Sequence, residues 1–424
     1  MFCSSRGFRK KLAFPSKHQT GSDWFFEWPT EEDSMESTSI PITDSESTKM
    51  LRQTVRNVCA PFGHRYFLEM SRSKGHPREL WKALGDADLL GVSVPEKFGG
   101  GGAGIAELVI VTEEVAASGS PLMLLALSPA VCATTLVAHG SPAQQQRWLP
   151  GLVSGRDVLA FAITEPEAGS NSHRIRTRAT RTHDGWSLSG SKTYISHLDN
   201  AQGILIVAKV GAEDSVTGKD GLGLFLLDVI APGLIAHEID VEITSPERQY
   251  TLFLDDVYLP ADSLVGEPGD GMSALFTGLN PERIGSAALL NGIARYALDK
   301  GARYASERVV WDVPIGAHQA IAHPLARAHV LLEASHLLTA RAAAMFDAQM
   351  DAGEASNIAK VCASEAASAA LDAAIQAHGG NGMATEYGLS TLLGLVRLFR
   401  IAPVSTEMSL NHIARKSLGL PKSY

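Results

Sequence analysis

Residues 161–196 contain the residue types best suited to binding a polar cofactor. The first half of this stretch alternates apolar and polar residues up to Thr164 and then enters a Pro-Glu-Ala-Gly-Ser turn; residues 186–196 alternate again around a Ser-Gly pair. The pattern predicts two strands joined by polar turns, with backbone N–H groups and small hydroxyls exposed at the strand ends. Such groups suit a planar cofactor that carries phosphates. An ordinary β-meander remains the alternative on these residues alone.

The segments on both sides of this stretch have a helical pattern. Apolar residues recur at helical spacing from Asp44 to about Gly155, and the period changes to two from Asp157 to about Ser263. Alanine-rich helical segments follow over residues 284–306, 318–350 and 356–377. Helices, then strands, then helices predict an α+β fold with segregated layers. We expect an all-α domain over residues 46–156, a β-sheet domain over 157–270 and an α-helical domain over 271–424.

Composition excludes several classes of function. The net charge of -9 gives no broad attraction for nucleic acid or an anionic membrane. The apolar run 122–138 is interrupted by Pro129 and falls short of the ~20 residues that a bilayer requires, so we expect a buried helix and no membrane span. His197, His378 and His412 match no metal-ligand spacing, so no metal site is expected.

The cysteines and the N-terminal segment bear on location. The four cysteines contain no CxxC pair, which is typical of a reduced, intracellular protein. Residues 1–45 begin with basic residues and become rich in Ser, Thr and Glu. We interpret them as a disordered tail or the product of a misplaced start, which favours a cytoplasmic protein. A transit peptide to the mitochondrial matrix is the alternative.

The run Thr164-Glu165-Pro166-Glu167-Ala168-Gly169-Ser170, followed by Tyr194-Ile195-Ser196, resembles the flavin-binding strands of the acyl-CoA dehydrogenase family. In that family the first motif surrounds the isoalloxazine and pyrophosphate of FAD, and the second places an aromatic residue on the far face of the flavin. The resemblance therefore implies FAD contacts at Phe161, Ile163, Thr164, Gly169, Ser170, Tyr194 and Ser196. It also implies the family's fold, in which the C-terminal domain is a four-helix-bundle-like unit.

Three later groups of residues fit the same resemblance. Arg308, Trp311 and Gln319 have the spacing of family residues that reach FAD across a subunit interface, with Trp in place of the usual Phe. Gln376 and Gly380 lie in a Gly-rich loop that resembles a flavin-contacting loop, and Ser405 and Glu407 match contacts to the adenosine half of FAD. The resemblance implies a homo-oligomer, a dimer or a tetramer. Taken singly, a His-Gly-Gly helix cap and a surface arginine explain some of these residues equally well.

The catalytic base departs from the family's usual pattern. That base is a Glu in a Glu-Gly-Thr motif near the C-terminus, and the corresponding position is Pro403, which also lacks a backbone N–H. Isovaleryl- and long-chain-type members instead carry a Glu 26 residues before the interface Arg, which here is Glu282. The residues also support a second interpretation, in which Asn280 is an N-cap, Pro281 is the first helical residue and Glu282 is an acid in the first turn.

We therefore expect FAD-dependent oxidation of an acyl-CoA thioester to the 2,3-enoyl-CoA by α-proton abstraction and β-hydride transfer. An electron-transfer flavoprotein is the electron acceptor by family analogy. An oxygen-using acyl-CoA oxidase or flavin monooxygenase is one alternative. A non-catalytic flavin- or acyl-binding relative is another, because Pro403 replaces the usual base. The resemblance also leaves open whether the thioester is carried by CoA or by a carrier protein.

Overall fold

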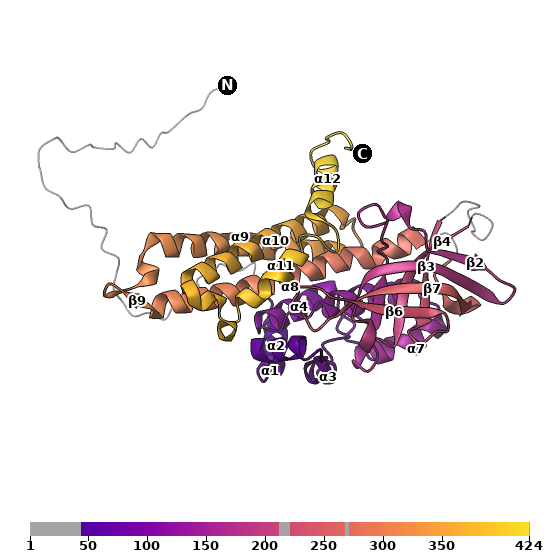
Figure 1. Ribbon diagram of the computed structural model, residues 1–424, viewed down its shortest axis with the longest axis horizontal. Helices are drawn as coiled ribbons and strands as arrows, with labels where there is room; N and C mark the ends of the chain where they lie inside the picture. The colour runs from indigo at the N-terminus through magenta and orange to yellow at the C-terminus, as the bar shows by residue number, and fades with distance from the viewer. Residues whose placement is uncertain (1–43, 212–220, 268–270, 424) are drawn as a thin grey trace, which may run out of the picture. The chain divides into compact units, whose positions relative to one another are not determined.

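The computed structural model describes residues 44–211, 221–267 and 271–423. The expected tail, residues 1–45, lies outside the described residues except for its last two positions. The described elements follow the order helices, strands, helices, as Figure 1 shows by the colour change along the chain. This order and the central sheet confirm the predicted α+β fold class. The domain boundaries stay a prediction.

The N-terminal helices are short, and two of them begin at a side-chain cap. They are α1 (Glu46–Cys59), α2 (His64–Arg72), α3 (Arg78–Asp86), α4 (Ile105–Ala117), α5 (Leu124–Leu127), α6 (Thr134–His139) and α7 (Pro142–Val153). The Ser45 hydroxyl caps α1, and Ser141 forms a capping box with Gln144 at the start of α7. Helix α4 is buried along nearly its whole length and packs against α8 and α1.

The apolar run 122–138 is buried, as expected, but it is not one continuous helix. A π-helical segment, η2 (Ser128–Ala133), separates α5 from α6 and contains Pro129. Proline removes a backbone donor and crowds the preceding turn, which explains the altered helical geometry at this point. Within residues 44–211, 221–267 and 271–423, no helix combines the length and apolar character needed to cross a membrane.

The sheet contains β1 (Leu159–Ala162), β2 (Arg178–Arg181), β3 (Gly185–Ser196), β4 (Gly203–Val210), β5 (Gly221–Asp228), β6 (Leu234–Ile239), β7 (Gln249–Pro260) and β8 (Leu264–Val265). Their order is β6-β7-β3-β2-β4-β5-β8, and β1 pairs with β4 in parallel. Strand β1 is buried at all four positions, so the alternation expected around Phe161 is absent there. A parallel strand covered on both faces does not need a polar side.

The C-terminal part contains three long helices, α8 (Gly271–Glu307), α9 (Gln319–Asp347) and α10 (Gly353–His378). They run beside one another in Figure 1, and each packs against the other two. Alanines that are fully buried on α10, such as Ala363, Ala367 and Ala370, allow the helix backbones to approach closely. The hairpin of β9 (Val309–Val310) and β10 (Val313–Pro314) links α8 to α9, and α11 (Leu393–Leu398) and α12 (Thr406–Lys416) follow α10.

The second interpretation, in which Asn280 is an N-cap and Pro281 the first helical residue, is wrong. Helix α8 begins at Gly271 and contains Pro281 in its interior, so Glu282 is not in a first turn. Proline in a helix interior gives up one backbone hydrogen bond. Here α8 continues through the proline because it is packed on both sides, against α6 and η2 and against α10. The dipole of a helix N-terminus therefore does not explain an acid at position 282.

Candidate active site

Two segments that were singled out in the sequence are joined directly in the structure. The Lys192 ammonium lies 2.8 Å from Oε1 of Glu165 and donates a 3.0 Å hydrogen bond to the Ile163 carbonyl. The backbone N–H of Thr193 donates to the Thr164 carbonyl at 2.9 Å. These contacts fix the end of β1 and the following turn against the middle of β3.

The Glu165–Lys192 pair is buried, and its charges depend on each other. Burial alone would raise the pKa of Glu165, but hydrogen bonds from Lys192, Thr177 and Arg176 lower it below its usual value. Burial lowers the pKa of Lys192 to about 8, and the carboxylate of Glu165 offsets part of this effect. At neutral pH the pair is therefore ionised on both sides.

Tyr194 owes its exposure to an irregularity in β3. The register between β3 and β7 shifts between Lys192 and Ile195, and Tyr194 has a φ of 57°. A bulge of this kind redirects a side chain, and a tyrosine with positive φ is an uncommon, strained conformation that is frequent at functional sites. The Tyr194 side chain is 61% exposed, whereas Ile195 is buried. Ser196, at the end of the strand, exchanges hydrogen bonds with Gln249.

The remaining predicted cofactor contacts in the sheet domain range from buried to exposed. Phe161 is buried, Ile163 and Thr164 are half-buried, and Gly169 and Ser170 are exposed in the turn. A Cβ atom added at Gly169 would meet no atom within 4 Å. An exposed aromatic ring, a serine hydroxyl and an open glycine turn on one rigid unit are compatible with a planar cofactor that carries phosphates. The residues present thus fit a flavin.

A second group of predicted contacts gathers at the far end of α8. Arg308 and Trp311 belong to the β9–β10 hairpin region and Gln319 begins α9; all three are exposed, Trp311 to 85%. Gln376 and Gly380 lie nearby, because the loop after α10 is held to α8 by a 3.0 Å hydrogen bond from Asn381 to the Tyr304 hydroxyl. Figure 1 shows β9 at the opposite end of α8 from the strands of the sheet.

Within one chain, this second group does not meet the rest of the site. Glu282 and Arg308 lie on or directly after the same helix, 26 residues apart, which corresponds to about 39 Å along the helix axis. Arg308 and its neighbours therefore lie far from the chemistry proposed for Glu282 in the same chain.

The last pair of predicted contacts begins α12. The Ser405 hydroxyl accepts a 3.2 Å hydrogen bond from the Met408 N–H and caps the helix, and Glu407 is exposed in its first turn. The loop before this helix, which includes Pro403, is attached to α10 because the Lys360 ammonium donates to the Val404 carbonyl.

Glu282 is a buried carboxyl without a partner. It is 7% exposed, and its side chain makes no hydrogen bond or ion pair with any described residue. Burial raises its pKa to about 7, although the nearby cations Arg283 and Lys360 lower it in part. The Arg283 guanidinium donates hydrogen bonds to the Asn280 side chain, one turn earlier on α8, and to the Ser356 hydroxyl on α10. A carboxyl poised near neutral pH and free of partners has the properties of a general base.

Glu247 is a competing buried carboxyl with different surroundings. Burial raises its pKa as well, but both of its oxygens are hydrogen-bonded, to the Leu124 N–H at 3.1 Å and to the Ser245 hydroxyl. A carboxylate occupied in this way is more consistent with a structural role, because it accepts a hydrogen bond from a buried N–H at the start of α5, which has no partner within the helix. Glu282 therefore remains the better candidate base.

Comparison with known protein families accounts for this arrangement. Residues 45–156, 160–257 and 269–418 match the N-terminal, middle and C-terminal domains of acyl-CoA dehydrogenase, respectively. The chain belongs to the acyl-CoA dehydrogenase family. The family consists of FAD-dependent oxidoreductases, so the predicted family, enzyme class and cofactor are confirmed.

Several known proteins are similar to this chain over most of its length. The acyl-CoA dehydrogenase FadE12 of Mycobacterium tuberculosis is 47% identical over 389 residues, which is 91% of this chain and 100% of that protein. The mitochondrial isovaleryl-CoA dehydrogenase of Oryza sativa is 32% identical over 80% of this chain and 82% of its own. A glutaryl-CoA dehydrogenase from Mycobacterium smegmatis, solved in complex with FADH2, has a TM-score of 0.83 at 26% identity, over 90% of this chain and 96% of that chain.

Two buried lysines of this dehydrogenase were missed in the sequence. Lys192 is separated from Trp186 and Leu188 by an even number of residues, so it lies on the same buried face of β3. Strict alternation along the strand would therefore have indicated a buried lysine that needs a partner. Lys360 lies one helical turn after Ser356 on the apolar face of α10, which gives a similar signal. Neither pattern identifies the partner, because Glu165 and Val404 come from other elements.

Proposed function

We propose that this acyl-CoA dehydrogenase oxidises an acyl-CoA thioester to the 2,3-enoyl-CoA, with Glu282 as the base that removes the α proton. The observation that carries the proposal is the state of Glu282, a buried carboxyl without hydrogen bonds whose pKa is raised to about 7. Bound FAD would supply the acceptor for the hydride that leaves the β carbon.

Each part of the chain has a defined role in this proposal. Glu282, which is held on the rigid helix α8, takes the α proton of the substrate. The nearby cations Arg283 and Lys360 favour the ionised form of its carboxyl, although burial disfavours it. The residues of β1 and β3 named above, with Tyr194 at the bulge, hold the flavin, and Ser405 and Glu407 contact its adenosine half. Pro403 takes no part in proton transfer, since proline has no basic side chain.

The same proposal requires a second copy of the chain. Arg308, Trp311, Gln319, Gln376 and Gly380 lie at the far end of α8, and their exposure suits contacts with the FAD of a partner subunit. A homodimer is the minimum, and a homotetramer is the arrangement that we propose. We further propose an electron-transfer flavoprotein as the acceptor and a cytoplasmic location.

The decisive experiment mixes the purified, FAD-loaded protein anaerobically with a panel of acyl-CoAs of different chain length and branching while the flavin absorbance is followed. At least one acyl-CoA should bleach the flavin. The Glu282→Gln variant should bleach roughly 10²–10⁴-fold more slowly with the same FAD content, because it loses only the basic lone pair. Equal rates for both proteins would show that the base lies elsewhere.

The rate at which the bleached flavin is re-oxidised distinguishes the dehydrogenase from the oxygen-using alternative. If bleached protein regains its absorbance with air faster than with an electron-transfer flavoprotein, the oxygen-using alternative is favoured over the dehydrogenase. A wild-type protein that binds FAD but is bleached by no acyl-CoA would instead support a non-catalytic relative.

A further inference from the structure

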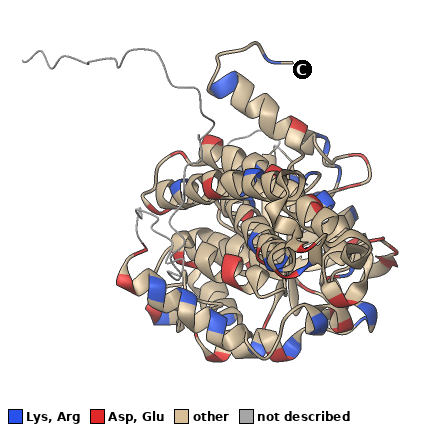
Figure 2. Ribbon diagram, turned by 90° about the vertical axis from the view of Figure 1, so that its left-hand side faces the viewer, with Lys and Arg blue, Asp and Glu red and all other residues tan. Residues whose placement is uncertain are grey.

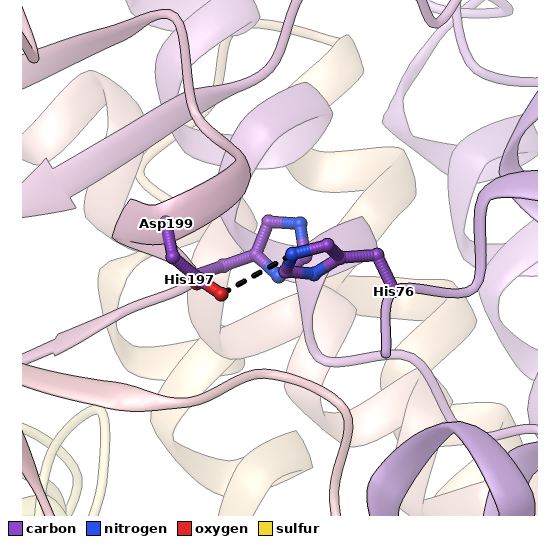
Figure 3. A group of neighbouring side chains, drawn as sticks. All are labelled: His76, His197 and Asp199. Carbon is purple, nitrogen blue, oxygen red and sulfur yellow. Dashed lines mark ion pairs between the residues drawn. The ribbon is translucent and has the colours of Figure 1, made fainter. Parts of the chain in front are cut away.

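Two histidines and an aspartate from separate parts of the chain lie together beside the end of β3 (Figure 3). His76 is in the loop between α2 and α3, His197 directly follows β3, and Asp199 lies in the short helix η4 (Leu198–Asn200). One possible ligand atom from each residue lies within 4.8 Å of the other two. No sequence motif indicates this group, because His76 is remote in sequence from the other two residues.

Each histidine of this cluster has one ring nitrogen with a partner and one without. Nε2 of His76 lies 3.2 Å from Oδ2 of Asp199, and Nε2 of His197 lies 3.2 Å from the amide nitrogen of Asn200. The Nδ1 atoms of both histidines are buried and have no hydrogen-bond partner. His197 is 1% exposed, so its unpartnered ring nitrogen is an exception among buried polar groups and calls for an explanation.

We propose that His76, His197 and Asp199 bind a divalent cation of the zinc type through two imidazole nitrogens and one carboxylate oxygen. This donor set suits zinc and its neighbours better than calcium or magnesium, which prefer oxygen ligands alone. The 3.2 Å between His76 Nε2 and Asp199 Oδ2 is close to the ligand–ligand separation of about 3.3 Å expected in a tetrahedral zinc site. The proposal departs from the sequence-based expectation that the chain has no metal site.

The cluster is partly accessible to solvent. The side chains of His76 and Asp199 are 11% and 17% exposed, so the cluster opens to solvent on that side while His197 closes it from within. Three protein ligands and one water form the usual complement of an open zinc site. Because His197 follows Ser196 directly, a bound ion would tie the α2–α3 loop to the end of strand β3.

A neighbouring arginine opposes cation binding at this cluster. The guanidinium of Arg248 also contacts Oδ2 of Asp199, and Arg78 donates to the side chain of Asn200. A bound cation therefore competes with Arg248 for the carboxylate.

The test is equilibrium dialysis of the full, FAD-loaded chain against Zn²⁺ after removal of metals with a chelator, with elemental analysis of the protein. Wild type should bind one Zn²⁺ per chain, and the metal should raise the melting temperature. The exposed His183, in the turn between β2 and β3, provides a matched control, and His183→Asn should bind as wild type does. His197→Asn and Asp199→Asn should lose at least tenfold in affinity, and Arg248→Gln should gain.

Asparagine is chosen at position 197 because it tolerates the left-handed φ of 62° found there. If His197→Asn fails to fold, His76→Gln in the loop provides the same test. Melting temperature and FAD content measured without metal distinguish loss of the site from loss of the fold. The proposal is overturned if wild type binds no more Zn²⁺ than His76→Gln or His197→Asn.

Discussion

Lys192 and Glu165 form an ion pair of 2.8 Å between side chains that are 0% and 4% exposed, and this pair joins the two segments proposed to hold the flavin. Lys192→Met would leave the Glu165 carboxylate buried without its cation, which costs about 3–5 kcal/mol in comparable cases. We expect a marked drop in the denaturation midpoint and loss of bound FAD, measured by urea unfolding and by absorbance.

The matched control for this prediction is the double variant Glu165→Gln/Lys192→Met. It removes both charges and should regain much of the stability lost by the single variant, because no unpaired buried charge remains. A Lys192→Met protein as stable as wild type would show that the pair contributes nothing to holding the two strands.

The raised pKa of Glu282 predicts how this residue affects stability with pH. Its folded pKa of about 7 lies above the ordinary value of 4.5, so the folded state binds the proton more tightly than the unfolded state. Stability therefore falls as pH rises from about 4.5 to about 7 and then levels off, by on the order of 3 kcal/mol in total. Glu282→Gln cannot ionise and should unfold at higher urea than wild type at pH 8, with a much smaller difference at pH 5.

The same group predicts the pH profile of the reaction. Glu282 must be unprotonated to accept a proton, so kcat/KM should rise about tenfold per pH unit below pH 7 and reach a plateau above it. The measurement uses a confirmed acyl-CoA substrate and an artificial electron acceptor between pH 5.5 and 8.5. A profile that is flat, or that falls over this range, is incompatible with Glu282 as the base.

Arg308 should matter for assembly and for the cofactor together. Arg308→Ala removes an exposed cation proposed to contact the FAD of a partner subunit, so we expect lower FAD content and a weaker oligomer. Arg303, an exposed arginine five residues earlier on α8, is the matched control, and Arg303→Ala should behave as wild type does. Light scattering with absorbance detection measures mass and flavin in one run. If both variants keep flavin and mass equally, Arg308 is only a surface charge.

Moving the base tests the relationship between Glu282 and Pro403. Pro403→Glu in the Glu282→Gln background places a carboxyl at the family's usual position, on the loop that Lys360 holds through Val404. Partial recovery of flavin reduction by an acyl-CoA would show that the two positions face the same substrate carbon. A double variant that folds, binds FAD and stays as slow as Glu282→Gln would show that position 403 does not reach the substrate.

The parts of the fold that follow a period could be predicted from sequence, and the parts that depend on tertiary pairing could not. Helix α4, for example, lies within the region from Asp44 to about Gly155 where the spacing of apolar residues predicts helices. The start of α8 was placed wrongly because Asn280-Pro281 imitates a cap, and packing on both sides overrides that signal. The spacing of 26 residues to Arg308 identifies Glu282 as a candidate base from sequence. Its burial and its lack of hydrogen-bond partners are visible only in the three-dimensional structure.

Helix α8 sets the distance and the rotation between the proposed base and the proposed intersubunit contact. The helix carries Glu282 in its first half and ends one residue before Arg308. Deleting one residue between them would shorten the distance by only about 1.5 Å but rotate one end against the other by about 100°. The proposed base and the proposed intersubunit contact would then no longer face their targets together. Substitutions at the exposed positions of this stretch would preserve this relationship, whereas an insertion or a deletion would not. The interval of 26 residues therefore fixes a length and a rotation along the helix, in addition to being a sequence pattern.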